Sequence, residues 1–165
     1  MSLFNLIHLA MLPALLGHTP EVARATAIDA HAVALEEVPY FACDKDGDCE
    51  KAREKTAELL VVWTSAESAG KTWLDGDGGA SIGVMQINRR YLKHPALESF
   101  HASEDAVRGD RRLAMRVSLA WMRYLRTICK GEKPGLLAYA SGNCFGNTIA
   151  KSKVKYRMGF LGLSY

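Results

Sequence analysis

The stretch Leu59–Asn88 reads LLVVWTSAESAGKTWLDGDGGASIGVMQIN, and the rest of the chain is organised around it. It opens with a continuous apolar run that ends on a single carboxylate, Glu67. After Gly70 the chain changes to short glycine-rich turns that carry Asp77, and a mixed apolar and polar segment follows. Because a helix that is apolar on all sides belongs at the centre of a fold, the run predicts a buried helix. That helix would deliver Glu67 to the edge of a glycine-lined cleft.

Two local effects bear on the chemistry of Glu67. The side chain lies near the C-terminal end of the expected helix, where the helix dipole disfavours a negative charge. The preceding apolar run would also desolvate it. Both effects raise the pKa of a carboxyl group, and a carboxyl that stays protonated can serve as a general acid. The same pattern also fits a glutamate on an exposed last turn. The other residues near it must therefore show whether Glu67 lies in a cleft or on the surface.

Three further side chains could share a cleft with this acid. Asp77 supplies a second carboxylate ten positions later, across a turn with little side-chain bulk. The strand-like segment Val84–Gln86 could form the cleft floor, with the Gln86 amide free to hold a neutral polar ligand. Tyr139 lies just before a Ser-Gly break and could add a hydroxyl. Each also has an ordinary structural role, Asp77 in a turn, Gln86 on the surface and Tyr139 in the core.

Five short motifs follow one another along the chain: Glu67-Ser68, Ala69-Gly70-Lys71, Gly76-Asp77-x-Gly79, Gly83-Val84-Met85-Gln86-Ile87 and Ala138-Tyr139-Ala140-Ser141-Gly142. Together they resemble the catalytic region of goose-type lysozymes and of the related lytic transglycosylases in the lysozyme-like superfamily. The resemblance covers about residues 52–158. Any one motif is weak evidence, whereas the complete set in this order and spacing is specific.

The resemblance implies a mainly α fold of the α+β lysozyme-like class, with a small β-like or turn region beside the active-site cleft. We expect a lysozyme-like catalytic domain over residues 41–165, after an N-terminal helical segment over residues 1–40 that is either a signal or packed helices. The implied enzyme cuts the MurNAc–GlcNAc β-1,4 bond of peptidoglycan glycan strands and needs neither a metal nor an organic cofactor. Glu67 would be the general acid, and Asp77 matches an aspartate that positions water in goose-type enzymes. The expected substrate-binding residues are Ser68, Ser81, Gln86, Asn88 and Tyr139.

Two departures from the family pattern bear on the mechanism. Asn88 replaces a second aspartate and cannot act as a base, and Ala140 stands where the family often has Asn. In an inverting hydrolysis, Asp77 would activate water on the face opposite the acid. In a lytic scheme, which the loss of the second aspartate slightly favours, the sugar's own 6-hydroxyl attacks and no second carboxylate is needed. The departures also leave open a catalytically inactive peptidoglycan-binding or assembly protein with the same fold.

The composition fits a single domain with a sizeable core, because 48% of the 165 residues are hydrophobic and 24% are charged. The formal net charge of +3 is mild. It suits an anionic polymer such as a bacterial cell wall, but it is too weak to indicate a nucleic-acid partner. We expect a monomer whose partner is the glycan strand.

The four cysteines are Cys43, Cys49, Cys129 and Cys144. Pairing Cys43 with Cys49 and Cys129 with Cys144 gives two local bridges, although four cysteines permit three connectivities. Free buried thiols are the alternative, and zinc is disfavoured because neither pair has metal-ligand spacing. The even number is compatible with an oxidising compartment.

The N-terminal residues 3–17 are nearly all apolar, but the run is short for a bilayer span and Pro13 interrupts it. We therefore expect no stable membrane span. Ala23-Arg24-Ala25 resembles a signal-peptide cleavage site, yet no Lys or Arg precedes the apolar run. A helix packed on the domain is the favoured interpretation, and a secretory signal is the alternative. The expected location is the cell envelope, periplasmic or secreted, or the protein is a phage-derived lysis protein.

Helical periodicity and capping residues predict five helices in the rest of the chain: Pro20–Glu37, Cys49–Ser68, Asp110–Cys129, Leu136–Ala140 and Asn147–Met158. Thr19 is expected to cap the first of them and Asp48 the second. The loop Asp44–Glu50 lacks the ligand set of a calcium loop and predicts a solvated turn. The cluster of Lys and Arg in the last helix predicts a solvated face.

Overall fold

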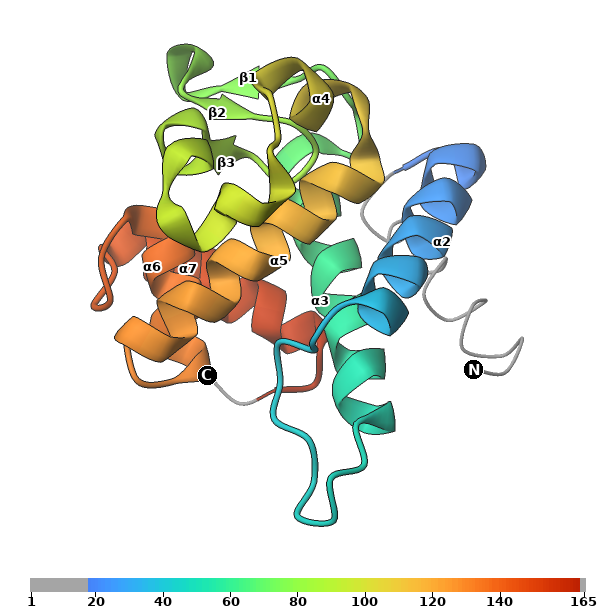
Figure 1. The fold of residues 1–165 in the computed structure, drawn as a ribbon, viewed down its shortest axis with the longest axis vertical. Helices are drawn as coiled ribbons and strands as arrows, with labels where there is room; N and C mark the ends of the chain where they lie inside the picture. The colour runs from blue at the N-terminus through green and yellow to red at the C-terminus, as the bar shows by residue number, and fades with distance from the viewer. Residues whose placement is uncertain (1–17, 164–165) are drawn as a thin grey trace.

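The computed structural model describes residues 18–163, which form a mainly helical fold with one small sheet (Figure 1). The α-helices are α2 (Pro20–Glu36), α3 (Glu50–Ser68), α4 (Glu104–Gly109), α5 (Arg111–Ile128), α6 (Glu132–Ser141) and α7 (Thr148–Phe160). The strands are β1 (Asp75–Gly76), β2 (Ser81–Ile82) and β3 (Ile87–Asn88), with 3-10 helices η1 (Asp77–Gly79), η2 (Arg89–Lys93) and η3 (Pro95–Phe100). The mainly α expectation is confirmed. The helix expected within residues 3–17 lies outside the described residues.

Helix α3 forms the centre of the core. The residues Leu59, Leu60, Val61, Val62 and Trp63 are each at most 1% exposed. A helix that is apolar on all sides is stable only when other elements cover every face, and α2, α5 and α7 all pack on α3. The helix ends at Ser68 as predicted, because Ala69 adopts a left-handed conformation with φ 53°. This ending places Glu67 in the last turn.

The three short strands form an antiparallel sheet in the order β1-β2-β3, in which Gly76 pairs with Ser81 and Ile82 with Ile87. The segment Val84–Gln86, predicted to be strand-like, is instead part of the turn between β2 and β3. Gly83 explains the difference, because its φ of 68° breaks the extended backbone. A Cβ at this position would also lie 2.6 Å from the Val107 carbonyl oxygen of α4.

Ion pairs and hydrogen bonds fix the sheet to its neighbours. Arg108 of α4 donates to both carboxylate oxygens of Asp75 at 2.8 and 3.0 Å, and its guanidinium lowers the pKa of Asp75. The Ser68 hydroxyl lies 2.8 Å from the Val84 carbonyl oxygen, which links the end of α3 to the turn after β2. The sheet therefore holds a defined position relative to Glu67.

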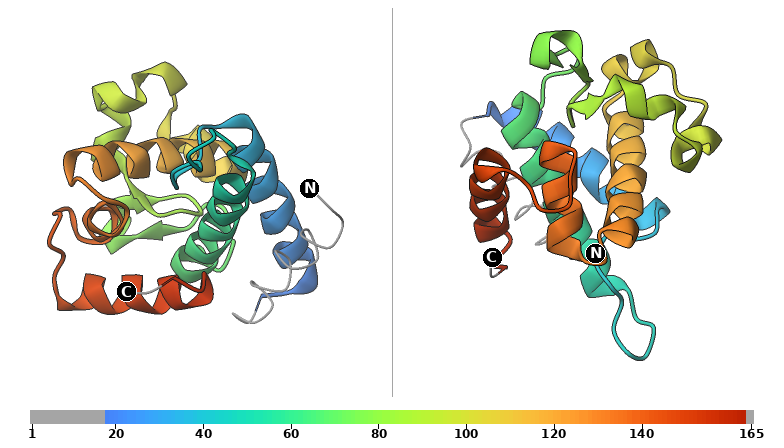
Figure 2. Two further views of the ribbon diagram at one scale, coloured as in Figure 1. Left: turned by 90° about the horizontal axis from the view of Figure 1, so that it is seen from below. Right: turned by 90° about the vertical axis from the view of Figure 1, so that its left-hand side faces the viewer.

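Helices α5, α6 and α7 are consecutive neighbours, as the right-hand view of Figure 2 shows. Helix α6 begins at Glu132, before the predicted start at Leu136, because Pro134 is tolerated in a first turn. Helix α7 begins one residue after the predicted start, since Asn147 is its N-cap and accepts a hydrogen bond from the Ala150 N–H at 2.8 Å. No helix within residues 18–163 is long and apolar enough to cross a membrane.

The basic residues of α7 do not all face solvent as predicted. Lys151, Lys153 and Lys155 are exposed, but the Arg157 side chain is only 3% exposed. Arg157 shares the buried face of the helix with Val154 and Met158. This correction matters for the functional site, because Arg157 reaches Glu67.

The loop between α2 and α3, at the bottom of Figure 1, is the expected turn. The Asp44 carboxylate accepts hydrogen bonds from the N–H groups of Asp46 and Asp48 at 3.0 and 2.8 Å. Asp48 in turn accepts from the Glu50 N–H at 2.9 Å, although the N-cap itself is Cys49. The carboxylates of Asp44 and Asp48 thus accept hydrogen bonds from backbone N–H groups in the turn before α3 and at its start.

Two disulfides join Cys43 to Cys49 and Cys129 to Cys144, which confirms the predicted local pairing. Removing the second bridge, as Cys129→Ser/Cys144→Ser, is expected to lower the free energy of unfolding by about 2–3 kcal/mol. The reason is that this bridge closes a span of 15 residues, which the unfolded chain otherwise explores freely. Urea unfolding measures the loss. The control, Cys43→Ser/Cys49→Ser, opens a span of only 6 residues and should cost less; a larger cost there would contradict the ranking.

Candidate active site

A cavity of about 510 Å³ opens where the C-terminal end of α3 meets the sheet. Its wall is formed by residues of α3, the sheet and its turns, η2, α5, α6 and α7. The volume lies within the range of about 300–1,000 Å³ that is typical of ligand sites. Motifs that lie far apart between Glu67 and Tyr139 in the sequence therefore line one cavity.

Most of the site residues expected from the sequence line this cavity: Glu67, Asp77, Ser81, Gln86, Asn88 and Tyr139. Ser68 does not line it. Its side chain points into the interior, where Oγ lies 3.0 Å from the Thr64 carbonyl oxygen and 2.8 Å from that of Val84. Ser68 is only 3% exposed, so it anchors the end of α3 to the sheet and is not placed to contact a ligand.

Glu67 faces the cavity from the last turn of α3, and its side chain is 18% exposed. Arg157 of α7 lies behind it and donates a hydrogen bond from Nη1 to Oε1 at 2.7 Å. The guanidinium carbon of Arg157 lies 4.6 Å from the ring centroid of Trp63, one turn earlier in α3. The helix end and the apolar surroundings oppose a negative charge on this carboxyl, whereas the guanidinium stabilises one.

Asp77 is held in place by the turn that carries it. Its φ of 51° is left-handed, a conformation that aspartate tolerates better than most residues, and Gly78 follows with φ 64°. The Ser81 hydroxyl donates to Asp77 Oδ2 at 2.8 Å. Ser81 therefore orients the second carboxylate of the cavity, and its own hydroxyl proton is engaged in doing so.

The amides of Gln86 and Asn88 serve the backbone as well as lining the cavity. Gln86 Nε2 donates to the carbonyl oxygens of Leu74 and Gly83, both at 2.8 Å, so the NH2 group of this amide is not free, contrary to the expectation. This bonding accompanies a left-handed φ of 50° at Gln86. Asn88 Oδ1 accepts from the Arg90 N–H at 3.2 Å and caps η2.

Tyr139 brings α6 into contact with the floor of the cavity. Its hydroxyl donates to the Met85 carbonyl oxygen at 2.9 Å, and its ring meets Trp63 edge-on with centroids 6.4 Å apart. Burial raises the pKa of the Tyr139 hydroxyl. The phenol is therefore neutral at physiological pH and fixes the turn after β2 against α6.

Sequence reasoning missed an aromatic and basic part of the lining. Tyr91 stacks on Trp121 with centroids 4.4 Å apart and planes at 26°, which gives the cavity a rigid aromatic wall. Arg90 and Lys153 add two positive charges to the rim. Arg157 was also missed, although Ala150, Val154, Arg157 and Met158 recur at helical spacing and place it on an apolar face.

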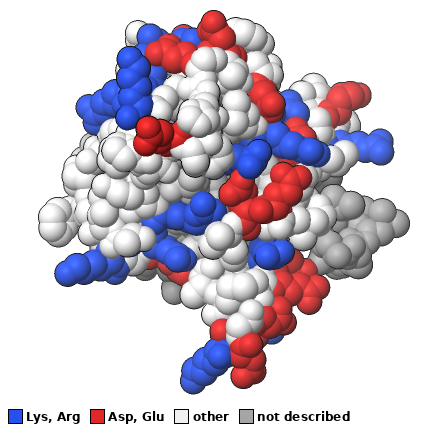
Figure 3. All heavy atoms as spheres, viewed as in Figure 1, with Lys and Arg blue, Asp and Glu red and all other residues white. Residues whose placement is uncertain are grey.

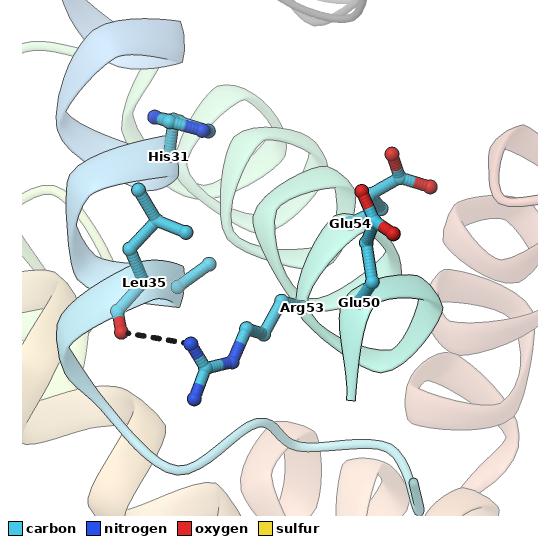
Figure 4. A pocket seen from close by; sticks show the side chains of 6 residues that line it. His31, Leu35, Glu50, Arg53 and Glu54 are labelled. Carbon is cyan, nitrogen blue, oxygen red and sulfur yellow. Dashed lines mark hydrogen bonds between the residues drawn. The ribbon is translucent and has the colours of Figure 1, made fainter. Parts of the chain in front are cut away.

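A second, much smaller cavity of about 80 Å³ lies between α2 and α3. Figure 4 shows Arg53 of α3 directed toward Leu35 of α2, whose carbonyl oxygen accepts its hydrogen bond at 3.2 Å. Glu50 and Glu54 lie on the same helix as Arg53, and their side chains point away from Leu35. Burial lowers the pKa of the nearby His31, so its imidazole is neutral at pH 7. The volume of this cavity is far below the range of about 300–1,000 Å³ that is typical of ligand sites, so it is not the candidate site.

On the face of the molecule shown in Figure 3, acidic and basic side chains are interspersed. This face therefore has no extended patch of positive charge of the kind that attracts nucleic acids. Within residues 18–163, no three His, Cys, Asp or Glu side chains are grouped as a metal site would require. Comparisons with protein-family models, with curated proteins and with solved structures found no match.

Proposed function

We propose that this protein is a peptidoglycan glycosidase with a lysozyme-like catalytic domain, which cleaves the MurNAc–GlcNAc β-1,4 bond with Glu67 as general acid. One observation carries the proposal. Glu67 leaves a buried helix directly into a cavity that also gathers Asp77, Gln86 and Tyr139, residues up to 72 positions away in the chain. The order of these residues supports the same assignment, because it follows the motifs of goose-type lysozymes and lytic transglycosylases.

The lining suits a sugar polymer that carries acidic groups. Sugars offer hydroxyl groups for hydrogen bonds and apolar C–H faces for aromatic rings, and the cavity supplies polar side chains beside Tyr91 and Trp121. MurNAc and its stem peptides carry carboxylates. Arg90 and Lys153 at the rim are positive charges that attract such groups. The two disulfides are compatible with the oxidising compartment in which the cell wall lies.

In the proposed reaction, the proton of Glu67 passes to the glycosidic oxygen while the bond from that oxygen to the anomeric carbon breaks. Arg157 then stabilises the carboxylate that remains on Glu67. In the lytic route, the 6-hydroxyl of the MurNAc residue that carries the anomeric carbon attacks that carbon. The hydroxyl gives its proton to Glu67, and the product has a 1,6-anhydro end. In the hydrolytic route, water attacks and Asp77 accepts its proton, which leaves a reducing end.

Mass analysis of the products from purified cell walls tests the function and separates the two routes. We expect anhydro ends, because Asn88 replaces the second aspartate and the lytic route needs no base besides Glu67. Asp77→Asn keeps the acceptor for Ser81 and should then reduce the rate by less than about tenfold, whereas hydrolysis with Asp77 as base loses about 10²-fold or more. Reducing ends together with a large loss in Asp77→Asn would overturn the lytic assignment.

A second candidate function is peptidoglycan binding without cleavage. The ion pair between Arg157 and Glu67 favours it, because the guanidinium already engages Oε1 of the carboxyl that cleavage requires as a proton donor. Ala140, where the family pattern often has Asn, points the same way. This candidate predicts that purified protein binds cell walls and releases no sugar products at any pH, whereas detectable products exclude it.

A further inference from the structure

Arg157 is an unusual neighbour for a proton donor. Its side chain is 3% exposed, lies against the Trp63 ring and donates to Glu67 at 2.7 Å. A buried guanidinium requires a partner of opposite charge, and in the described part of the chain Glu67 is the one carboxylate that forms an ion pair with it. The geometry therefore couples the charge of Arg157 directly to the carboxyl that faces the cavity.

The positive charge acts on the reaction in two opposite ways. Before cleavage Glu67 must carry a proton, and a guanidinium at this distance lowers the fraction of molecules that do so at a given pH. During cleavage Glu67 becomes a carboxylate, and the same guanidinium stabilises that product of proton transfer. Arg157 should therefore raise the maximum rate and also confine it to a more acidic range.

Other charged and titratable groups line the cavity that Glu67 faces. Asp77 comes from the turn after β1, Arg90 from η2, Tyr139 from α6 and Lys153 from α7. The Asp77 carboxylate accepts from Ser81, and the Tyr139 phenol is neutral at physiological pH. In the described residues Arg157 is the charged group in direct contact with Glu67, so its effect should exceed the effects of the rim charges.

From this geometry we infer that Arg157 is a positioning residue that sets the pH range in which Glu67 can cleave the glycan. The inference rests on the proposed function. It adds to that function a residue that resemblance to the family did not supply and that does not line the cavity. The pH dependence of cleavage should therefore change when the guanidinium beside Glu67 is removed.

The test is the pH profile of kcat/KM on purified cell walls for the full chain and three variants. On the alkaline side of the profile, the pH at which kcat/KM falls to half its maximum should rise by about one unit or more in Arg157→Gln. The maximum of kcat/KM should fall by about tenfold or more. Arg157→Lys keeps a positive charge beside Glu67 and should shift the half-maximum less than Arg157→Gln does. Lys155→Gln removes an exposed charge of the same helix and should leave both values unchanged.

A purely structural role for Arg157 predicts lower activity at every pH with an unmoved half-maximum, and that result overturns the inference. Should Arg157→Gln fail to fold, the wild-type protein supplies the test through the NMR signal of the Arg157 Nε–H group. That signal should titrate with the same midpoint as the alkaline loss of activity, and a different midpoint overturns the inference. A wild-type protein that is inactive at all pH values instead overturns the proposed function itself.

Discussion

Glu67→Gln is expected to abolish the release of soluble sugar products from purified cell walls, with a loss of about 10³-fold or more. The glutamine side chain has the same shape and keeps an oxygen that accepts the hydrogen bond from Arg157. It cannot, however, give a proton to the glycosidic oxygen. Because geometry is preserved, the loss would report the missing proton and not a rearranged cavity.

The control for this experiment is Glu36→Gln, which changes an exposed carboxylate at the end of α2. It should leave the rate of product release unchanged. Circular dichroism at room temperature should match the wild-type protein for both variants. Glu67→Gln also leaves the buried Arg157 guanidinium without a counter-charge, so its free energy of unfolding should fall while the fold is kept. Full activity in Glu67→Gln would reject the assignment of Glu67 as general acid, and the released products would also exclude binding without cleavage.

The helices and the position of Glu67 could be predicted because their signals are local. The apolar run Leu59–Trp63 indicates a buried helix, and the Ala69-Gly70 ending indicates where it stops. Thr19 and Asn147 cap the helices that follow them, as their side chains favour.

Long-range contacts could not be predicted in the same way. The hydrogen bond from Arg157 to Glu67 joins residues 90 positions apart, and the Tyr91–Trp121 stack joins η2 to α5. Gln86 looked free because its two acceptors are the backbone oxygens of Leu74 and Gly83, which no side-chain motif reveals. A single sequence shows which side chains are available, whereas packing decides which of them are already engaged.

Arg157→Met is expected to lower the free energy of unfolding by about 3–4 kcal/mol, measured by urea unfolding at neutral pH. Methionine can fill much of the space over the Trp63 ring, but it leaves Glu67 as an unpaired carboxylate beside the core. The cavity admits some water to Glu67, which is 18% exposed, so the cost should stay below that of a fully enclosed charge. Lys155→Met on the exposed side of α7 is the control and should change stability by less than about 0.5 kcal/mol.

The double variant Glu67→Gln/Arg157→Met separates charge pairing from packing. It removes both charges, so it should be more stable than Arg157→Met alone by about 1–2 kcal/mol, although it carries one more substitution. That recovery would show that the cost of the single change comes from an uncompensated carboxylate at the mouth of the cavity. If the losses of unfolding free energy of the two single variants instead add up in the double variant, Arg157 stabilises α7 mainly through its contact with Trp63. The interaction energy between the Arg157 guanidinium and the Glu67 carboxylate would then be small.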